Sequence, residues 1–64
     1  MEYQVIGYCK TRGIGYVSEY YKSRENAIAH ARECRADEED SAVSYRVEAS
    51  ENGRVLCTID ETKA

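Results

Sequence analysis

Proline, tryptophan and phenylalanine are absent from the sequence, and methionine and histidine occur once each. Long apolar runs are also missing, so no segment is predicted to span a membrane. The N-terminal segment has neither a basic start nor a following apolar stretch, and no signal peptide is predicted. A chain of 64 residues is too short for a nucleotide-binding α/β fold or a cleft between two lobes, so residues 1–64 are expected to form one domain.

Large aliphatic side chains are scarce, which predicts a thin hydrophobic core. Six tyrosines add apolar area, and the net charge of −3 is small enough for a folded chain. Small domains with so little apolar material commonly rely on a disulfide, a metal or a partner subunit, and a homodimer is one such form. The ten large aliphatic residues are Val5, Ile6, Ile14, Val17, Ile28, Val43, Val47, Val55, Leu56 and Ile59.

The three cysteines, Cys9, Cys34 and Cys57, bear on the cellular compartment. A secreted scaffold of this length usually carries an even and denser set of cysteines for its disulfides. An odd number is more typical of reduced thiols, and we therefore expect a cytoplasmic protein.

The distribution of β-branched, aromatic and turn-forming residues predicts four strands and one helix. The strands are expected at residues 3–9, 16–21, 41–50 and 54–60, and the helix at residues 24–36. A connection as short as residues 10–15 requires the first two strands to be antiparallel. The order β-β-α-β-β predicts an α+β two-layer sandwich, in which one helix packs on one face of a four-stranded antiparallel sheet. The order of the strands within the sheet does not follow from the pattern.

The helix has a clear start and a narrow apolar stripe. Ser23 is a favourable N-cap residue, and neither glycine nor proline interrupts the segment that follows. Ala27, Ile28, Ala31 and Cys34 lie at helical spacing on one face. Because most of these side chains are small, the helix is expected to lie close to the sheet.

The last two strands are joined at Asn52-Gly53. A two-residue turn would place the apolar residues of the final strand on the polar face of its neighbour. A three-residue loop with a left-handed Gly53 would instead pair Ala49 with Val55 and keep the apolar side chains together. We therefore predict the three-residue loop.

The first strand is expected to turn Val5 and Gly7 toward the helix, because a glycine would let an alanine-rich helix approach closely. This choice leaves an aromatic and aliphatic surface outside, which is typical of a protein contact. The candidate partner-binding residues are Ile6, Tyr8, Tyr16, Tyr20 and Tyr21.

His30 and Cys34 are four residues apart, a spacing that lets one helix supply two metal ligands or a nucleophile and its base. The sequence has no Cys-x-x-Cys motif that would indicate a metal site. The alternative is that the cysteines are small buried hydrophobic residues. So small a domain also leaves little room for a water-excluding pocket. We therefore predict no catalytic residue, no metal site and no cofactor.

Charge is divided unevenly along the chain. Residues 1–36 carry six basic and four acidic side chains, giving +2, whereas residues 37–64 carry three basic and eight acidic ones, giving −5. Lys10 and Arg12, in the first turn, are candidates for contact with an anion or a nucleic acid. The acidic run at residues 37–40 either steers the protein toward a basic partner or only keeps it soluble.

The functional hypothesis is a small non-enzymatic protein–protein interaction module that acts as a regulator or inhibitor, of the kind encoded by phages and mobile elements. The alternative is a nucleic-acid-binding accessory protein that uses the basic turn and the tyrosines of the first hairpin. The overall acidity of the chain argues against this alternative.

Overall fold

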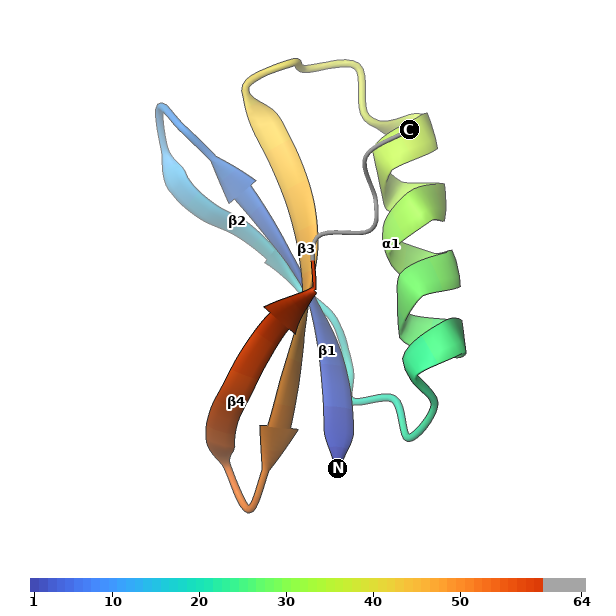
Figure 1. Ribbon diagram of the computed structural model, residues 1–64. Coiled ribbons are helices and arrows are strands. Elements are labelled where there is room, and N and C mark those ends of the chain that lie inside the picture. The colour runs from blue at the N-terminus through green and yellow to red at the C-terminus, as the bar shows by residue number, and fades with distance from the viewer. Residues whose placement is uncertain (60–64) are drawn as a thin grey trace.

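The computed structural model describes residues 1–59 of the chain. Strands β1 (Glu2–Cys9) and β2 (Gly13–Val17) precede the helix α1 (Arg24–Asp37), and strands β3 (Val43–Glu51) and β4 (Arg54–Ile59) follow it (Figure 1). The strands form one antiparallel sheet in the order β2-β1-β3-β4. The predicted α+β fold is confirmed, and β1 and β3 are the central strands. Residue 60, the predicted end of the last strand, lies outside the described residues.

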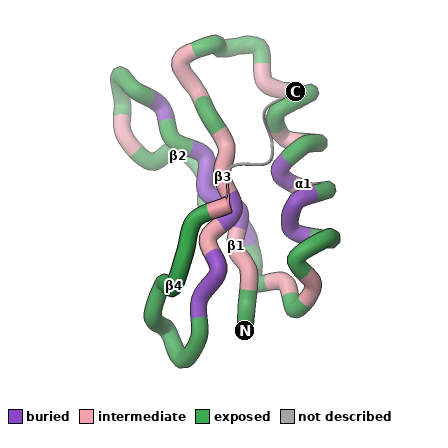
Figure 2. The backbone as a smooth tube through the Cα atoms, viewed as in Figure 1, coloured by how far each residue is buried: buried purple, intermediate pink, exposed green. Residues whose placement is uncertain are grey.

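Burial is concentrated between α1 and the two central strands. Figure 2 shows the buried segments on the helix and on β1 and β3, while β4 is exposed along almost its whole length. The buried hydrophobic residues among residues 1–59 are Val5, Ile6, Cys9, Ala27, Ile28, Ala31, Val47 and Ala49. The core is therefore as thin as the composition indicates.

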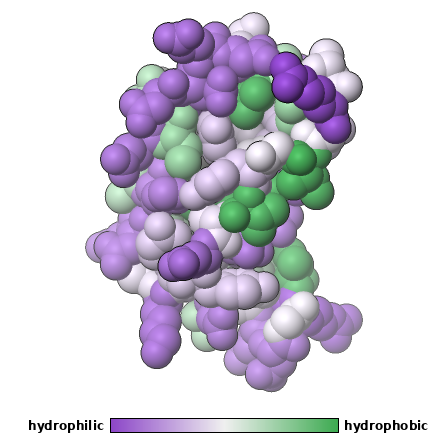
Figure 3. Space-filling view, turned by 180° about the vertical axis from the view of Figure 1, so that it is seen from behind, coloured by the Kyte–Doolittle hydropathy of each residue, from purple (hydrophilic) through white to green (hydrophobic). Residues whose placement is uncertain are grey.

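The face of the sheet that points away from α1 is not covered by any other helix or strand among residues 1–59. We call it the open face. Seen from behind, the strongly hydrophobic side chains gather in the middle and toward the right of the view, away from the helix (Figure 3). Apolar groups are thus divided between a buried side and a solvent-facing side of one sheet.

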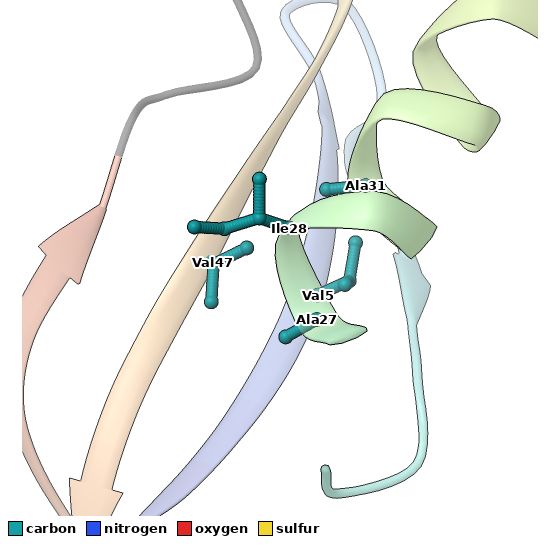
Figure 4. Packing of buried hydrophobic residues seen from close by; sticks show 5 residues of the cluster. All are labelled: Val5, Ala27, Ile28, Ala31 and Val47. Carbon is teal, nitrogen blue, oxygen red and sulfur yellow. The ribbon is translucent and has the colours of Figure 1, made fainter. Parts of the chain in front are cut away.

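The centre of the fold is a contact between the two middle strands beneath the helix. Val5 of β1 and Val47 of β3 are cross-strand partners, and neither side chain is exposed to solvent. Ala27, Ile28 and Ala31 pack on them from α1 (Figure 4). Two of these three helical residues are alanines, so the contact between α1 and the sheet is made mainly by small side chains.

The helix begins where the sequence predicts. The side chain of Ser23 accepts a hydrogen bond from the backbone N–H of Asn26 at 3.3 Å, and the first turn carries the acidic Glu25. Both features satisfy or complement the free N–H groups at a helix start. Within residues 1–59, no helix is long and apolar enough to cross a membrane.

The prediction of a three-residue loop between β3 and β4 is wrong. Glu51 pairs with Arg54 across a two-residue turn, in which Asn52 and Gly53 both have positive φ angles of 54° and 79°. Such a turn matches the twist of the flanking strands. The register then shifts by one residue, so that Leu56 has no partner in β3.

This β-bulge restores part of the arrangement that the three-residue loop was predicted to give. Beyond it, Cys57 pairs with Ala49 and Ile59 pairs with Val47, which keeps these residues on the helix side of the sheet. Val55 lies before the bulge and pairs with Ser50, so it takes the opposite face and remains 53% exposed.

Strand β2 also differs from its predicted range of 16–21. A three-residue loop closes the first hairpin, and β2 starts at Gly13, whose φ is 93°. β2 ends at Val17, although Ser18 still bonds to Val5 through its backbone N–H and its hydroxyl oxygen, and Tyr21 forms an isolated bridge to Tyr3. The chain therefore follows β1 over the predicted span without remaining a regular strand.

Gly7 faces the helix side, as predicted, but not to admit the helix. A Cβ atom at this position would lie 2.7 Å from Cε1 of Tyr45 and 3.0 Å from Cβ of Tyr16. These distances are shorter than ordinary van der Waals contact. Glycine is required here because two tyrosines from the neighbouring strands close over it.

Replacement of Val47 by aspartate should unfold the protein. An unpaired carboxylate at this fully buried position costs several kcal/mol, which is comparable with the whole stability of about 3–10 kcal/mol expected for a chain of this length. The control is Glu48→Gln, which changes the next residue on the open face and should cost about 1 kcal/mol or less, because its ion pair is partly exposed. Thermal melts followed by circular dichroism measure both, and equal loss in the two variants would contradict this placement of β3.

Candidate functional site

The residues predicted to bind a partner do not form one surface. Ile6 and Tyr8 lie on the open face, because they alternate with Val5 and Gly7 along β1. Tyr16 pairs with Gly7, which places it on the helix side, and Tyr21 packs against the core there. Tyr20 lies in the connection to α1 and is exposed.

A group of exposed apolar side chains lies on the open face of the first hairpin. Val17 pairs with Ile6, and Ile14 pairs with Tyr8, so these side chains share one face across β1 and β2. Tyr8, Ile14 and Val17 are 39%, 64% and 53% exposed. We call these three residues the hairpin patch.

Ile6, another of the predicted contact residues, is almost completely buried. Its side chain is only 5% exposed, although it lies on the open face. Its cross-strand partners are Val17 on one side and Arg46 on the other. Ile6 therefore packs against the residues of the hairpin patch and offers almost no surface to a partner.

Polar side chains occupy the open face beside the patch. Arg46 and Glu48 lie two residues apart on β3 and form an ion pair, with Nη2 and Oε2 separated by 3.1 Å. Gln4 donates a hydrogen bond from Nε2 to the carbonyl oxygen of Ser18 at 2.8 Å. On the β3 side the apolar surface is thus bounded by Arg46 and Glu48, which pair with each other, and Gln4 of β1 is already bonded to Ser18.

On the helix side, tyrosines gather around the single histidine. The Tyr16 hydroxyl lies 2.8 Å from Nε2 of His30, and the ring of Tyr21 lies 5.6 Å from the His30 ring, measured between centroids. Burial raises the pKa of Tyr16 above its ordinary value. Two of the predicted contact residues are therefore engaged within the fold.

His30 also meets Cys34, as the helical spacing predicts, with 3.5 Å between Nε2 and Sγ. Burial, followed by the nearby negative charges of Glu33 and Asp37, raises the pKa of the Cys34 thiol. Within residues 1–59, no group of three potential metal ligands comes together. The pair lacks both a third ligand there and the lowered thiol pKa of an activated nucleophile.

A pocket of about 250 Å³ opens at the end of the sheet near the first hairpin loop. Its walls are two tyrosine rings, Tyr16 and Tyr45, whose planes are inclined by 68° with centroids 6.4 Å apart. Glu38 accepts a hydrogen bond from the Tyr45 hydroxyl at 3.2 Å, which fixes one wall against the loop after α1. The full lining is Gly7, Cys9, Arg12, Gly15, Tyr16, Glu38, Asp40, Val43 and Tyr45.

The uneven charge along the sequence does not become a separation in space. Arg12, at the tip of the first hairpin, lines the same pocket as Glu38 and Asp40 from the acidic run. Figure 1 shows the hairpin tip and the loop between α1 and β3 at the same end of the molecule. A wholly basic surface built from the N-terminal half is therefore not present at this end.

Cys9 is the thiol in the pocket lining. Its Sγ lies 3.2 Å from the Thr11 hydroxyl oxygen, within the loop that closes the first hairpin. Hydrogen bonds from the Thr11 side chain, and then from the backbone N–H groups of Thr11 and Arg12, lower the pKa of the Cys9 thiol. Cys9 is thus the thiol with the lowered pKa and Cys34 the one with the raised pKa.

Sequence reasoning missed Ile14, Val17 and the pocket. The signal for the first two was present, because both are large aliphatic residues of the segment that forms β2. Their shared face depends on a register shift between Gly7 and Tyr8, which no alternation pattern shows. The pocket depends on contacts between segments far apart in the sequence.

Comparisons with protein-family models, with curated proteins and with solved structures found no match to this chain. The hairpin patch and the pocket are therefore interpreted from their own geometry and chemistry.

Removal of the Thr11 hydroxyl should raise the pKa of Cys9. A lowered pKa means more thiolate at neutral pH, so Cys9 should be alkylated with a pH midpoint below that of Cys34. In Thr11→Val the Cys9 midpoint should move upward, whereas Thr11→Ser, which keeps a hydroxyl, should leave it nearly unchanged. Mass spectrometry of the separate cysteine peptides after pulsed alkylation gives both midpoints. The same Cys9 midpoint in the valine and serine variants would contradict the assignment.

Proposed function

We propose that this chain is a non-enzymatic protein-interaction module that docks on another protein through the hairpin patch. The observation that carries the proposal is the exposure of Tyr8, Ile14 and Val17, which are adjacent on a sheet face that no helix or strand covers within residues 1–59. Clustered apolar side chains of this kind mark sites of interaction more often than isolated ones do.

The energetics favour occupation of this face by a partner. Burial of apolar surface contributes about 25 cal/mol per Å², and tyrosine supplies a large contact area with few rotatable bonds. Ile6, held beneath the patch, keeps β1 and β2 packed together whether or not a partner is bound. Docking therefore gains contact area with little reorganisation of the chain.

Charge beside the patch defines the kind of partner surface. Lys10 lies in the loop that closes the same hairpin, two residues after Tyr8, whereas Arg12 lines the pocket beside Glu38 and Asp40. An apolar partner surface with a carboxylate near Lys10 complements this arrangement, and the charge pair would raise its rate of association. By covering such a surface, the module would act as a regulator or inhibitor in the cytoplasm, where reduced cysteines are expected.

The nucleic-acid alternative has less support. Single-stranded nucleic acid needs several aromatic faces along one basic groove. Tyr16 and Tyr21 contact His30 on the helix side, whereas Tyr8 lies on the open face. The predicted stacking residues are therefore divided between opposite sides of the sheet.

Val17→Lys should weaken binding of the docked partner at least tenfold, because it would place a charged group within the apolar contact. The matched control is Ala29→Lys, which adds the same charge at an exposed position of α1. Circular dichroism first checks that wild type and both variants are folded. Each is then immobilised to capture proteins from a cell extract, and the affinity of each captured protein is measured with purified components.

Retention of one stoichiometric protein by wild type and Ala29→Lys, with loss in Val17→Lys, is the expected result. Sedimentation of the purified chain shows whether a second copy is that partner. Equal affinity of wild type and Val17→Lys for every stoichiometric partner, including itself, would contradict the proposal.

A further inference from the structure

The pocket beside the first hairpin loop combines two aromatic walls with two carboxylates. Tyr16 and Tyr45 form a corner with an angle of 68° between their rings, and Glu38 and Asp40 stand in the same lining. Aromatic faces attract cations through their quadrupoles, and carboxylates add direct charge attraction. We propose that this pocket binds a cationic group of side-chain size, either an ammonium or a guanidinium group.

Gly15 lines the pocket and is the residue left without a partner where the register between β1 and β2 shifts. Its φ is not in the positive range, unlike those of Gly13 and Gly53. A Cβ atom at position 15 would meet only the carbonyl oxygen of Gly7, at 4.0 Å. Glycine within a strand often marks a bulge or the close approach of a ligand, and Gly15 combines a register shift with a place in the pocket wall. A side chain here would instead occupy the wall of the pocket.

The size of the pocket limits the ligand. Drug-sized molecules and cofactors occupy pockets of about 300–1,000 Å³, and the free volume here is about 250 Å³. A single amine or guanidine with its aliphatic stem fits this space, whereas a nucleotide does not. Val43 and the backbone of Gly7 supply apolar surface for the stem.

The charges around the pocket favour a cation. Glu38 and Asp40 outnumber Arg12, the cationic residue of the lining. Arg35 lies nearby, where its Nη1 donates a 3.4 Å hydrogen bond to the carbonyl oxygen of Val43, but it is not part of the lining. Arg12 therefore competes with a bound cation for the carboxylates, and its removal should strengthen binding. An anionic ligand would show the opposite dependence.

This proposal is independent of the hairpin patch. The patch lies on the open face of β1 and β2, and the pocket lies on the helix side of the same two strands. Loss of partner binding in Val17→Lys would leave the pocket intact, and filling of the pocket would leave the patch exposed. A negative result for partner binding at the hairpin patch would therefore not count against the pocket, and a negative result for the pocket would not count against the patch.

The test is an NMR titration of the ¹⁵N-labelled full chain with Nα-acetyl-lysine methylamide, which carries one ammonium group. We expect saturable shifts at the amides of Gly7, Gly15 and Tyr45, with a dissociation constant on the order of 1 mM. The matched control is Nα-acetyl-norleucine methylamide, which has a similar aliphatic stem without the charge and should bind at least tenfold more weakly. Free butylammonium is the second probe, and tighter binding of the lysine derivative would identify a protein side chain, rather than a free amine, as the source of the cation.

Three substitutions separate the contributions. Gly15→Val should abolish the saturable shifts, because its side chain would occupy the pocket wall, and it should leave the fold intact, because a Cβ atom at position 15 meets only the carbonyl oxygen of Gly7 at 4.0 Å. Asp40→Asn should weaken binding several-fold, and it can keep the side-chain oxygen that accepts from the Ala42 N–H at 2.9 Å. Arg12→Gln should strengthen binding several-fold.

Equal binding of the norleucine and lysine derivatives would overturn the proposal, as would absence of saturable shifts at the pocket. Weaker binding of the lysine derivative to Arg12→Gln would also overturn it. Phosphate provides the opposite control, and a saturable phosphate site at these amides that is lost in Arg12→Gln would assign the pocket to an anion instead.

Discussion

The fold depends on the contact between Val5 and Val47 beneath the alanines of α1. These two valines are the largest completely buried side chains among residues 1–59, and they join the central strands to each other and to the helix. One helix covers only one face of a four-stranded sheet. The chain has no second helix or further strand within residues 1–59 to cover the other face. The exposed hairpin patch is a direct consequence of building a domain from so few elements.

The small number of secondary-structure elements also explains the pocket. The small residues through which α1 packs on the sheet, Ala27 and Ala31, lie in its first eight residues. Toward the end of the helix, Tyr16 and Tyr45 take the place of small side chains between the layers, and Gly7 makes room for both rings. Large rigid rings fill this end less completely than alanines fill the other. An opening lined by aromatic rings and by the charged residues of the adjoining loops remains there.

The features that sequence predicted are those set by local pattern. The helix start at Ser23, its apolar stripe, and the inward face of β3 follow from capping and periodicity, and each is confirmed. What failed depends on single-residue shifts between strands. The bulge at Leu56 corrects the register of β4 after a two-residue turn, and a second shift in the first hairpin brings Ile14 onto the face of Tyr8. An alternation pattern assumes that such shifts are absent, so it does not show that Tyr16 lies opposite Gly7 on the helix side.

The central claim is that α1 shields one face of the sheet and leaves the hairpin patch open. Relaxation of methyl groups by a soluble gadolinium chelate tests it directly, at a concentration where the chain is monomeric. The methyl groups of Ile14 and Val17 should be strongly relaxed, whereas those of Val5 and Val47 should be almost unaffected. Equal protection of all four residues in the monomer would contradict the account, because the open face would then be covered.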